Sequence, residues 1–434
     1  MTQQQALQIM LSGASVFLTG PPGAGKTYVL NEFVRRAGRR RKRVAVTAST
    51  GIAATHIGGS TIHLWSGLGT RSTLTSKAKD RMYANDELRK RYLDTDVLVI
   101  DEISMLHGYR INLVDEACQL LRDSDAPFGG LQVILVGDLF QLPPVTKGDE
   151  AVDFVHTSAA WVDLHPEICY LSEQHRQQDD PLLDLLQAMR RGEFRRSHID
   201  ALRSRLDTRP SADAQVTRLC THNRDADSVN RQQLEALNSE GRTYAMAKVG
   251  PMFKLAQLAQ SVLAPATLEL KVGAEVMFVV NNPAKGFVNG TRGRVVGFRK
   301  HLPVVRMSTG GTVTIEPHSW ALVEEGRQRA EIIQLPLRLG WAITIHKSQG
   351  MSLDAAVIDL RKCFTPGMGY VALSRVRSLE GVYLTGINRM AMQLHPEIVG
   401  FDRELQETSR RLVETASASP AARSILRLPM RRAS

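Results

Sequence analysis

The sequence predicts an α/β protein built from two doubly wound domains, on the strength of three observations. Short runs rich in Val, Ile and Leu alternate with helical patterns over residues 1–170, and a second alternation begins at residue 217. Only the first carries a glycine-rich turn between a strand and a helix. Continuous apolar runs are typical of parallel strands buried on both faces, and such sheets bind ligands at the carboxyl ends of their strands.

Charge and cysteine content restrict the class of protein. The 434 residues include 55 Lys+Arg and 44 Asp+Glu, a formal charge of +11, which favours a polyanionic partner without requiring one. The four cysteines lie far apart, which argues against a zinc site or a disulfide framework and for a reduced compartment. We expect a cytoplasmic protein with no membrane partner, because there is no signal-peptide pattern and no apolar run of about 18 residues.

The first domain, residues 1–170, is expected to contain five buried strands with helices between them. In chain order the strands are SVFLTG, RVAVTAS, DVLVIDE, QVILVGD and ICYLSE. The polar, helix-prone residues 66–95 interrupt this alternation. We interpret them as a small helical insertion.

The second domain is expected over residues 171–240 and 325–408. TRLC starts its alternation, and AVIDL, YVALSRV and GVYLTGI close it. Residues 241–324 contain EVMFVVNN, RGRVVGF, PVVRMS and TVTIEP, divided by Asn-Gly, Gly-Gly and Pro signals. These short strands predict a small antiparallel barrel inserted into the domain. Residues 409–434 are basic and rich in Ala, Ser and Pro, and we expect a flexible tail there.

Residues 20–27, GPPGAGKT, match the pattern GxxxxGK[ST] between an apolar strand and a helical run, which is the context of a phosphate-binding loop. Glycines let backbone N–H groups turn towards phosphate oxygens, and the following helix adds its N-terminal dipole. Lys26 is predicted to reach the β- and γ-phosphates, and Thr27 to hold Mg²⁺. The predicted nucleotide-binding residues here are Gly20, Pro21, Pro22, Gly23, Ala24, Gly25, Lys26, Thr27 and Tyr28.

The strand VLVIDE places two carboxylates at its carboxyl end. Asp101 is suited to hold Mg²⁺ together with Thr27, and Glu102 to orient the attacking water, which favours hydrolysis of ATP. A GTPase is the alternative, because residues 146–149 resemble the guanine-reading sequence TKxD. They follow a Pro-Pro turn, and we interpret them as a loop.

Three further side chains are candidates for the hydrolytic site. Gln141 follows the strand QVILVGD and is placed to sense the γ-phosphate. The second half has no phosphate loop of its own, so we expect one nucleotide between the halves and positive charge contributed from across the cleft. Arg176 and Arg375 are the candidates, because a correctly placed arginine accelerates phosphoryl transfer by about 10³–10⁵.

Six stretches resemble, in order and spacing, the motifs of Pif-one (petite integration frequency) DNA helicases, in group B of helicase superfamily one. The resemblance spans roughly residues 3–390. The stretches are TASTGIAATHIGGSTIH, DEISM, GDLFQLPP, LSEQHRQ, LRLGWAITIHKSQGMSLD and YVALSRVRSLEGV. RecD-type helicases agree with the same motifs more loosely.

This resemblance implies two RecA-like domains, a wedge formed by residues 66–95, and an inserted barrel like a Src-homology-three (SH-three) domain. It implies ATP-driven 5′-to-3′ movement on single-stranded DNA and unwinding of duplexes, forks and G-quadruplexes, with RNA–DNA hybrids as further partners. Family roles include DNA repair, recombination and telomere maintenance. We expect a monomer that is able to dimerise on DNA.

The resemblance also assigns residues. Gln3 is similar to the glutamine that reads adenine, although Gln4 is an alternative; Gly350 joins the nucleotide-binding set, and Arg176 and Arg375 complete the site on domain closure. The residues implied to contact DNA are Thr50, Gly51, His63, Pro143, His346, Lys347 and Ser348. Trp65, at the start of the insertion, is open between a core position and a DNA contact.

Alternatives remain open at this point. Within the motor class, the chain fits a RecD-like subunit of a repair or recombination complex less well. A non-motor NTPase is disfavoured by Glu102 and by the second α/β half with its arginines. A passive single-strand binding protein would have no need of Lys26. Because the chain begins close to the phosphate loop, we expect a compact bacterial or phage enzyme that associates with the nucleoid.

Overall fold

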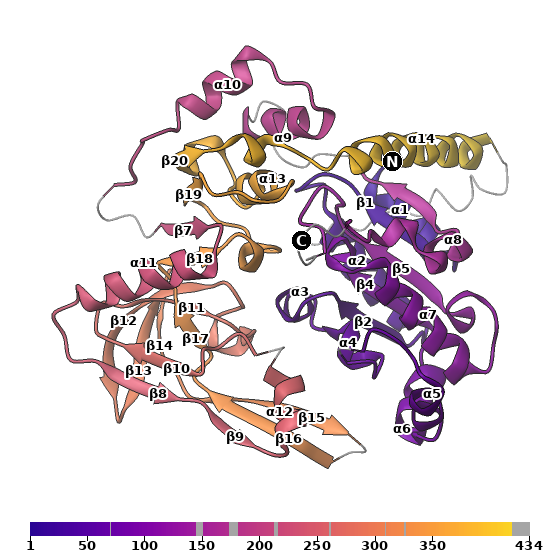
Figure 1. Cartoon of the computed structure of the whole chain (residues 1–434), viewed down its shortest axis with the longest axis horizontal. Coiled ribbons are helices and arrows are strands. Elements are labelled where there is room, and N and C mark those ends of the chain that lie inside the picture. The colour runs from indigo at the N-terminus through magenta and orange to yellow at the C-terminus, as the bar shows by residue number, and fades with distance from the viewer. Residues whose placement is uncertain are drawn as a thin grey trace.

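The computed structural model describes residues 1–69, 71–144, 151–172, 181–211, 216–259, 262–308, 310–324 and 327–418. Two parallel sheets, each flanked by helices, form the two halves of the molecule, and a third, antiparallel region extends from the second half (Figure 1). Among the described helices, none combines the length and the apolarity needed to cross a membrane.

The first domain is a six-stranded parallel sheet in the order β3-β2-β4-β5-β1-β6. All five strands expected from the apolar runs are confirmed. The additional strand, β3, has two residues, too few for an apolar run to reveal it. The strands are β1 (Val16–Thr19), β2 (Val44–Ala48), β3 (Ser60–Thr61), β4 (Val97–Asp101), β5 (Gln132–Val136) and β6 (Glu167–Tyr170).

Helices cover both faces of this sheet, which is why its strands are apolar on both sides. In β1, Phe17 packs into one hydrophobic cluster with residues of α7, whereas Val16 and Leu18 pack into another with α1 and α2. The helices are α1 (Gln3–Leu11), α2 (Lys26–Arg39), α3 (Gly51–His56), α4 (Ile62–Trp65), α5 (Ser76–Tyr83), α6 (Asp86–Leu93), α7 (Gly108–Arg122) and α8 (Ala159–Leu164), with 3₁₀ turns η1 (Ile103–Met105), η2 (Pro127–Gly130) and η3 (Val155–Thr157).

Residues 66–95, interpreted from the sequence as a helical insertion, contain the two helices α5 and α6. The side chain of Asn85 accepts a hydrogen bond from Leu88 N and so caps the start of α6. Trp65 is buried, and its ring lies 4.6 Å from that of Tyr92. Trp65 is therefore a core residue that anchors the insertion to the first domain.

The second domain is built on a four-stranded parallel sheet in the order β18-β7-β19-β20. AVIDL and GVYLTGI are strands, whereas YVALSRV mainly forms the helix α13 (Met368–Ser374). The strands are β7 (Thr217–Cys220), β18 (Ala342–Thr344), β19 (Ala356–Leu360) and β20 (Val382–Ile387). The other helical elements are α9 (Pro181–Arg191), α10 (Arg196–Arg203), α11 (Asn223–Glu235), η5 (His346–Ser348), η6 (Leu379–Gly381) and η7 (Arg389–Met392).

The inserted region is antiparallel, as predicted, but it extends further than residue 324. That boundary is wrong because it separates β15 (His318–Glu324) from β16 (Arg327–Gln334), which pair with each other, and leaves out β17 (Leu337–Leu339), which pairs with β11. Its sheets have the orders β14-β13-β12-β11-β17, β15-β16-β9 and β10-β8. The remaining elements are β8 (Arg242–Ala245), β9 (Ala247–Val249), α12 (Met252–Ala259), β10 (Thr267–Leu270), β11 (Glu275–Phe278), η4 (Pro283–Lys285), β12 (Arg292–Arg299), β13 (Leu302–Met307) and β14 (Thr312–Thr314).

The last helix, α14 (Pro396–Ala418), corrects the predicted start of the tail at residue 409, which falls inside it. The helix continues because its apolar face lies against the first domain, where Tyr170 N donates a hydrogen bond to Ser409 Oγ at 3.1 Å. It crosses to the first domain in Figure 1. Residues 419–434 of the predicted tail lie outside the described residues.

Candidate functional site

The phosphate loop joins β1 to α2 at the carboxyl edge of the first sheet. Gly25 has φ 86°, a backbone conformation that favours glycine, and a Cβ atom at this position would lie 2.0 Å from Nε2 of Gln3 and displace that side chain. Lys26 begins α2, and its Nζ donates to Gly20 O at 2.7 Å and Pro21 O at 3.2 Å. Burial lowers the pKa of Lys26, while the nearby Asp138 opposes that shift. The ammonium group of Lys26 therefore contacts the backbone of the loop that is expected to bind the phosphates.

The helix α1 places Gln3 on this loop. Thr2 caps the helix, and Gln3, at its first position, is buried and donates from Nε2 to Ala24 O at 3.0 Å. The two other predicted nucleotide residues are both exposed. Tyr28 is 55% exposed on the first turn of α2, and Gly350 has φ 79° two residues after the η5 segment of the second domain.

Asp101 and Glu102 follow one another at the carboxyl end of β4. Burial, and then the charge of Glu102, raise the pKa of Asp101 to about 7. Glu102 has φ 51° and ψ 44°, a left-handed conformation that is strained for a residue with a side chain, by about 1–3 kcal/mol. Its N–H donates to Asp101 Oδ1 at 2.8 Å. The strained turn thus directs two adjacent carboxylates towards the same edge of the sheet.

Glu102 is contacted from the second domain. Gln349 Nε2 donates to Glu102 Oε2 at 3.0 Å, while Gln349 Oε1 is buried and has no hydrogen-bond partner among the described residues. The sequence analysis missed Gln349. The available signal was its place in IHKSQG, between Ser348 and Gly350, which were both assigned.

Gln141 lies in the turn after β5, where its N–H donates to Asp138 O at 3.0 Å. Its side chain is buried, and within the described residues its Oε1 has no hydrogen-bond partner. The second domain approaches this turn closely: a Cβ atom on Gly367 would lie 2.9 Å from Phe140 O. A buried polar side chain between two domains is suited to respond to a ligand bound there.

Of the two candidate arginines, only Arg375 lies among the described residues. Arg176 lies outside the described residues, as do residues 146–149. Arg375, directly after α13, is 6% exposed and donates to Val371 O at 3.1 Å, to Ser374 Oγ at 2.8 Å and to Met351 O at 3.4 Å. These contacts hold its guanidinium on the second domain, so reaching a nucleotide requires this side chain to move.

The predicted DNA contacts in the first domain lie around α3 and α4. Thr50 Oγ1 accepts from Ala53 N at 3.2 Å and so caps α3, which begins at Gly51. Burial, and then the positive charge of Arg110, lower the pKa of His63 to about 4, so this ring is neutral at physiological pH. Pro143 follows Gln141 and is partly buried.

The predicted contacts in the second domain form η5. Ser348 is fully buried, and its Oγ donates to Ile345 O at 2.7 Å, so its side chain shapes the turn. Burial is the main cause that lowers the pKa of both His346 and Lys347. The ring of His346 is parallel to that of Phe364, with centroids 6.2 Å apart, and Phe364 is 54% exposed. Phe364 is a second aromatic candidate that the sequence analysis missed.

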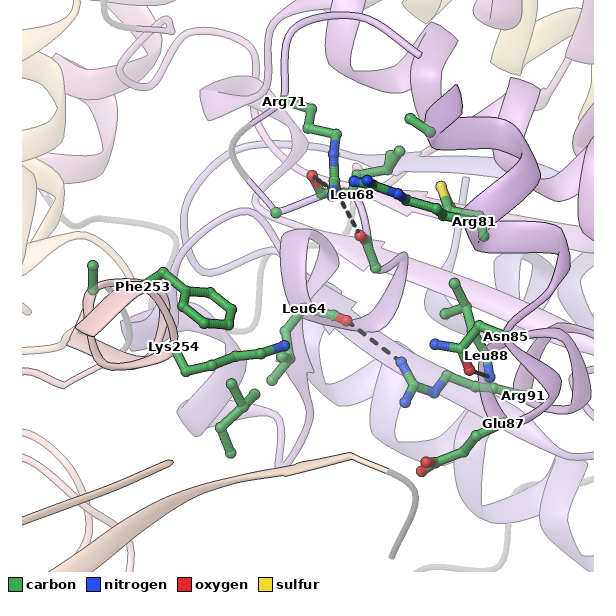
Figure 2. A pocket seen from close by; sticks show the side chains of 16 residues that line it. Leu64, Leu68, Arg71, Arg81, Asn85, Glu87, Leu88, Arg91, Phe253 and Lys254 are labelled. Carbon is green, nitrogen blue, oxygen red and sulfur yellow. Dashed lines mark hydrogen bonds between the residues drawn. The ribbon is translucent and has the colours of Figure 1, made fainter. Parts of the chain in front are cut away.

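A basic groove lies between the helical insertion and α12 of the inserted region, with a volume of about 540 Å³ (Figure 2). Arg71, Arg81, Arg91 and Lys254 line it, with Glu87 as the acidic residue. Arg71 and Arg91 are fixed by hydrogen bonds from their Nη1 atoms to Leu68 O and Trp65 O. Phe253, 69% exposed, reaches into the groove. Sequence analysis did not bring these two regions together.

The residues present fit a nucleoside triphosphate with Mg²⁺. Glycines form the turn of the cradle, and Asp101 is a carboxylate that a cation would keep ionised. The buried amide oxygen of Gln141, which has no hydrogen-bond partner among the described residues, is an acceptor suited to a water molecule rather than to a phosphate oxygen. Thr27 and Asp101 would hold the metal, which supplies positive charge to the phosphates when bound. Two parallel α/β domains that meet at this one cradle define an ATP-hydrolysing motor of the helicase class.

Comparison with known proteins agrees with this class. The family model described as PIF1-like helicase matches residues 3–198, and the model of the DNA helicase Pif1 2B domain matches residues 255–298. The ATP-dependent DNA helicase Pif1 of Psychrobacter sp. is 40% identical over 94% of this chain and 71% of its own length. The chain belongs to the PIF1-like family and is an ATP-dependent DNA helicase, with ATP and Mg²⁺ as its nucleotide and metal.

Solved structures give the same result. The Pif1 helicase of Candida albicans has a TM-score of 0.82 at 33% identity and covers 93% of this chain and 98% of its own. Pif1 from Bacteroides, solved in complex with ADP-AlF3 and single-stranded DNA, has a TM-score of 0.72 at 31% identity, covering 94% and 98%. The chain spans between 62% and 66% of the length of five vertebrate relatives.

Proposed function

We propose that this helicase moves 5′ to 3′ along single-stranded DNA and opens duplexes and forks ahead of it. The observation that carries the proposal is the hydrogen bond from Gln349 to Glu102, because it joins the hydrolytic carboxylate to the segment of the second domain expected to hold DNA. The Bacteroides relative, 31% identical, binds single-stranded DNA together with an ATP analogue, which supports the same use of the cleft here.

Each residue has a proposed role in this cycle. Lys26 and Gln141 bind the β- and γ-phosphates, Thr27 and Asp101 hold Mg²⁺, and Glu102 orients the attacking water. Gln3 contacts the adenine edge from its place on the loop. Arg176 and Arg375 approach from the second domain when the cleft closes. The closed state is favoured while the triphosphate is bound and opens after phosphate leaves, because the attraction to the arginines then falls.

Closure of the cleft is converted into movement along DNA because the two domains bind the strand tightly in alternation. Thr50, Gly51, His63 and Pro143 contact the strand from the first domain, while His346 and Lys347 contact it from the second, with Ser348 shaping the turn. Neutral histidines with hydroxyl and backbone donors suit contacts that read no sequence. Separating one base pair costs about 1–2 kcal/mol, which is less than the free energy of ATP hydrolysis. The alternating binding of DNA by the two domains is therefore needed to set the direction of movement, not to supply energy.

Strand separation is assigned to the helical insertion. The helices α5 and α6 act as the wedge, and the basic groove between them and α12 holds nucleic acid at the point of separation. Four cations with one carboxylate, and an exposed aromatic ring, match a strand whose phosphates and bases are both accessible. The five-stranded antiparallel sheet of the inserted region supports an SH-three-like barrel, while α12 packs on the neighbouring sheet β15-β16-β9.

Unwinding of tailed duplexes tests the polarity. A duplex with a 5′ single-stranded tail should be unwound in the presence of ATP and Mg²⁺, and one with a 3′ tail should not. The Lys26→Ala variant is the control, because it should bind single-stranded DNA normally while losing all unwinding. Unwinding from the 3′ tail alone would reverse the assignment.

The range of substrates is a separate part of the proposal. We include G-quadruplexes and RNA–DNA hybrids, because a motor that contacts one strand through phosphates places few demands on the structure it displaces. We further propose a monomer on single strands and a second copy on forks. Unwinding rates of forks measured against enzyme concentration test the second copy. A RecD-like subunit, the alternative, would unwind poorly unless a partner protein were added.

A further inference from the structure

A buried ion-pair network joins the two motor domains beside the nucleotide site. At its centre is Arg190 of α9, which is 7% exposed. Its Nη1 donates to Asp138 Oδ1 and to the Tyr370 hydroxyl, both at 2.8 Å, and its Nη2 donates to the Tyr170 hydroxyl at 2.8 Å and to Asp402 Oδ1 at 3.0 Å. Four of the five N–H donors of this arginine are therefore engaged, which is typical of a buried guanidinium that fixes the geometry around it.

The members of the network come from both halves of the chain. Asp138 and Tyr170 belong to the first domain, whereas Arg190, Tyr370 and Asp402 come from α9, α13 and α14. Burial would raise the pKa of Asp138, but the charges of Arg190 and Lys26 bring it below its ordinary value. The carboxylate therefore stays ionised, and it lies within electrostatic reach of the phosphate-loop lysine.

Tyr370 completes the link between the turn and α13. Its hydroxyl donates to Asp138 Oδ2 at 2.8 Å while accepting from Arg190, so one oxygen connects a first-domain carboxylate to a second-domain helix. The same turn carries Gln141. The start of α13 also approaches the turn, since a Cβ on Gly367 would lie 3.2 Å from Gln141 O.

The helix α13 connects two parts of the hydrolytic site. Its N-terminal end lies against the turn of Gln141, and Arg375 follows its C-terminal end. A helix of seven residues is about 10 Å long and rigid over that length. Any displacement of the turn relative to the second domain is therefore transmitted to the position of Arg375.

We propose that Tyr370 is a positioning residue that couples the Gln141 turn to Arg375. Through Asp138 and Arg190 it pins α13 to the turn, so that the change at Gln141 between the triphosphate and diphosphate states moves the arginine into or out of the cleft. This inference rests on the proposed function of Gln141 and Arg375. It assigns a mechanical role to a tyrosine that need not touch the nucleotide.

Two conservative variants separate this role from simple packing. Tyr370→Phe removes only the hydroxyl that joins α13 to Asp138 and Arg190, and it keeps the ring and the direct ion pair between those two residues. Tyr170→Phe is the matched control, because its hydroxyl accepts from the same guanidinium and donates to Asp402, but it lies on β6 of the first domain and not on α13. Both variants should melt at similar, slightly lowered temperatures.

Hydrolysis and closure are then measured without unwinding. Tyr370→Phe is expected to lower kcat about tenfold and to leave the affinity for ATP unchanged. This is the effect expected when one charge-assisted hydrogen bond is lost. Tyr170→Phe should retain the wild-type kcat. Domain closure is followed by energy transfer between dyes on cysteines replacing Lys42 and Glu235. The native cysteines are buried, which favours labelling at the two introduced positions.

The outcomes are distinct. A slowed closure in Tyr370→Phe alone, in parallel with kcat, supports the coupling. Equal losses in both variants, a loss of ATP affinity in place of kcat, or wild-type kinetics in Tyr370→Phe each overturn it. Failure of the proposed helicase cycle would appear in the wild-type protein, as absence of nucleotide-dependent closure, and is thereby distinguished.

Discussion

Gln349 and Glu102 lie 247 residues apart in the chain and meet across the domain interface, with Gln349 Nε2 donating to Glu102 Oε2 at 3.0 Å. The contact is made by the residue that follows η5, the segment proposed to hold DNA. The carboxylate that is proposed to orient the attacking water is therefore engaged by an amide of the second domain. We therefore expect DNA bound at His346 and Lys347 to affect the Glu102 carboxylate through the neighbouring Gln349.

Replacing Gln349 by Ala tests this route. The variant is expected to hydrolyse ATP about fivefold faster without DNA, because the carboxylate is released, and to show a smaller stimulation by single-stranded DNA. Gln233→Ala, at an exposed position of α11, is the control. Steady-state ATPase assays with and without DNA measure both quantities. Unchanged stimulation would show that the hydrogen bond does not link the two sites.

Arg375→Ala is expected to abolish turnover while leaving ATP binding nearly intact. In the structure its guanidinium contacts Val371 and Ser374 of the second domain, whereas the phosphate loop belongs to the first domain. A loss of about 10³-fold or more in kcat is the expected size for a cross-cleft arginine. Nucleotide affinity measured by a fluorescent analogue is the companion assay, and wild-type turnover would refute the role.

Gly25→Ala is expected to prevent nucleotide binding without unfolding the first domain. The added methyl group would meet the Gln3 amide at 2.0 Å in a backbone conformation that disfavours alanine. Calorimetric titration with ATP measures the loss, and thermal melting checks the fold. The double variant Gly25→Ala, Gln3→Ala should remain defective, because the strain in φ persists. Full recovery would mean that only the steric clash matters.

Phe253→Ala tests the basic groove. Removal of the ring is expected to slow unwinding of a forked duplex about fivefold, since stacking of one base on an aromatic ring contributes about 1–3 kcal/mol. ATP hydrolysis stimulated by single-stranded DNA should be unchanged. Met252→Ala is the matched control, because this neighbour is 86% exposed and does not line the groove. Equal effects of both changes would exclude a specific contact.

The neutral state of His63 predicts a pH dependence. Because its pKa in the folded protein is about 4 and its ordinary value is 6.5, the folded state binds a proton less readily than the unfolded chain. Stability is therefore lost as pH falls through this window and is fully present above it. Titration of the His63 ring by NMR measures the folded pKa directly. A midpoint near the ordinary value would contradict the burial described here.

Much of the first domain and the phosphate loop was predictable because the evidence is local. GPPGAGKT places a strand end, a turn and a helix start within eight residues, and backbone preferences alone arrange them. The parallel strands were equally readable from their apolar runs. The boundaries at residues 324 and 409 were wrong, because a paired hairpin and the packing of α14 on the first domain depend on distant partners.

The sequence by itself therefore determined the nucleotide chemistry, carried by residues adjacent in the chain: the cradle around Lys26 and the carboxylate pair after β4. Tertiary structure alone decided which residues of the second half meet that chemistry. Gln349 at Glu102, the Arg190 network at Asp138, and the groove between α6 and α12 arise from how separate domains pack. Local periodicity reports which face of an element is buried, and it does not identify the partner across an interface.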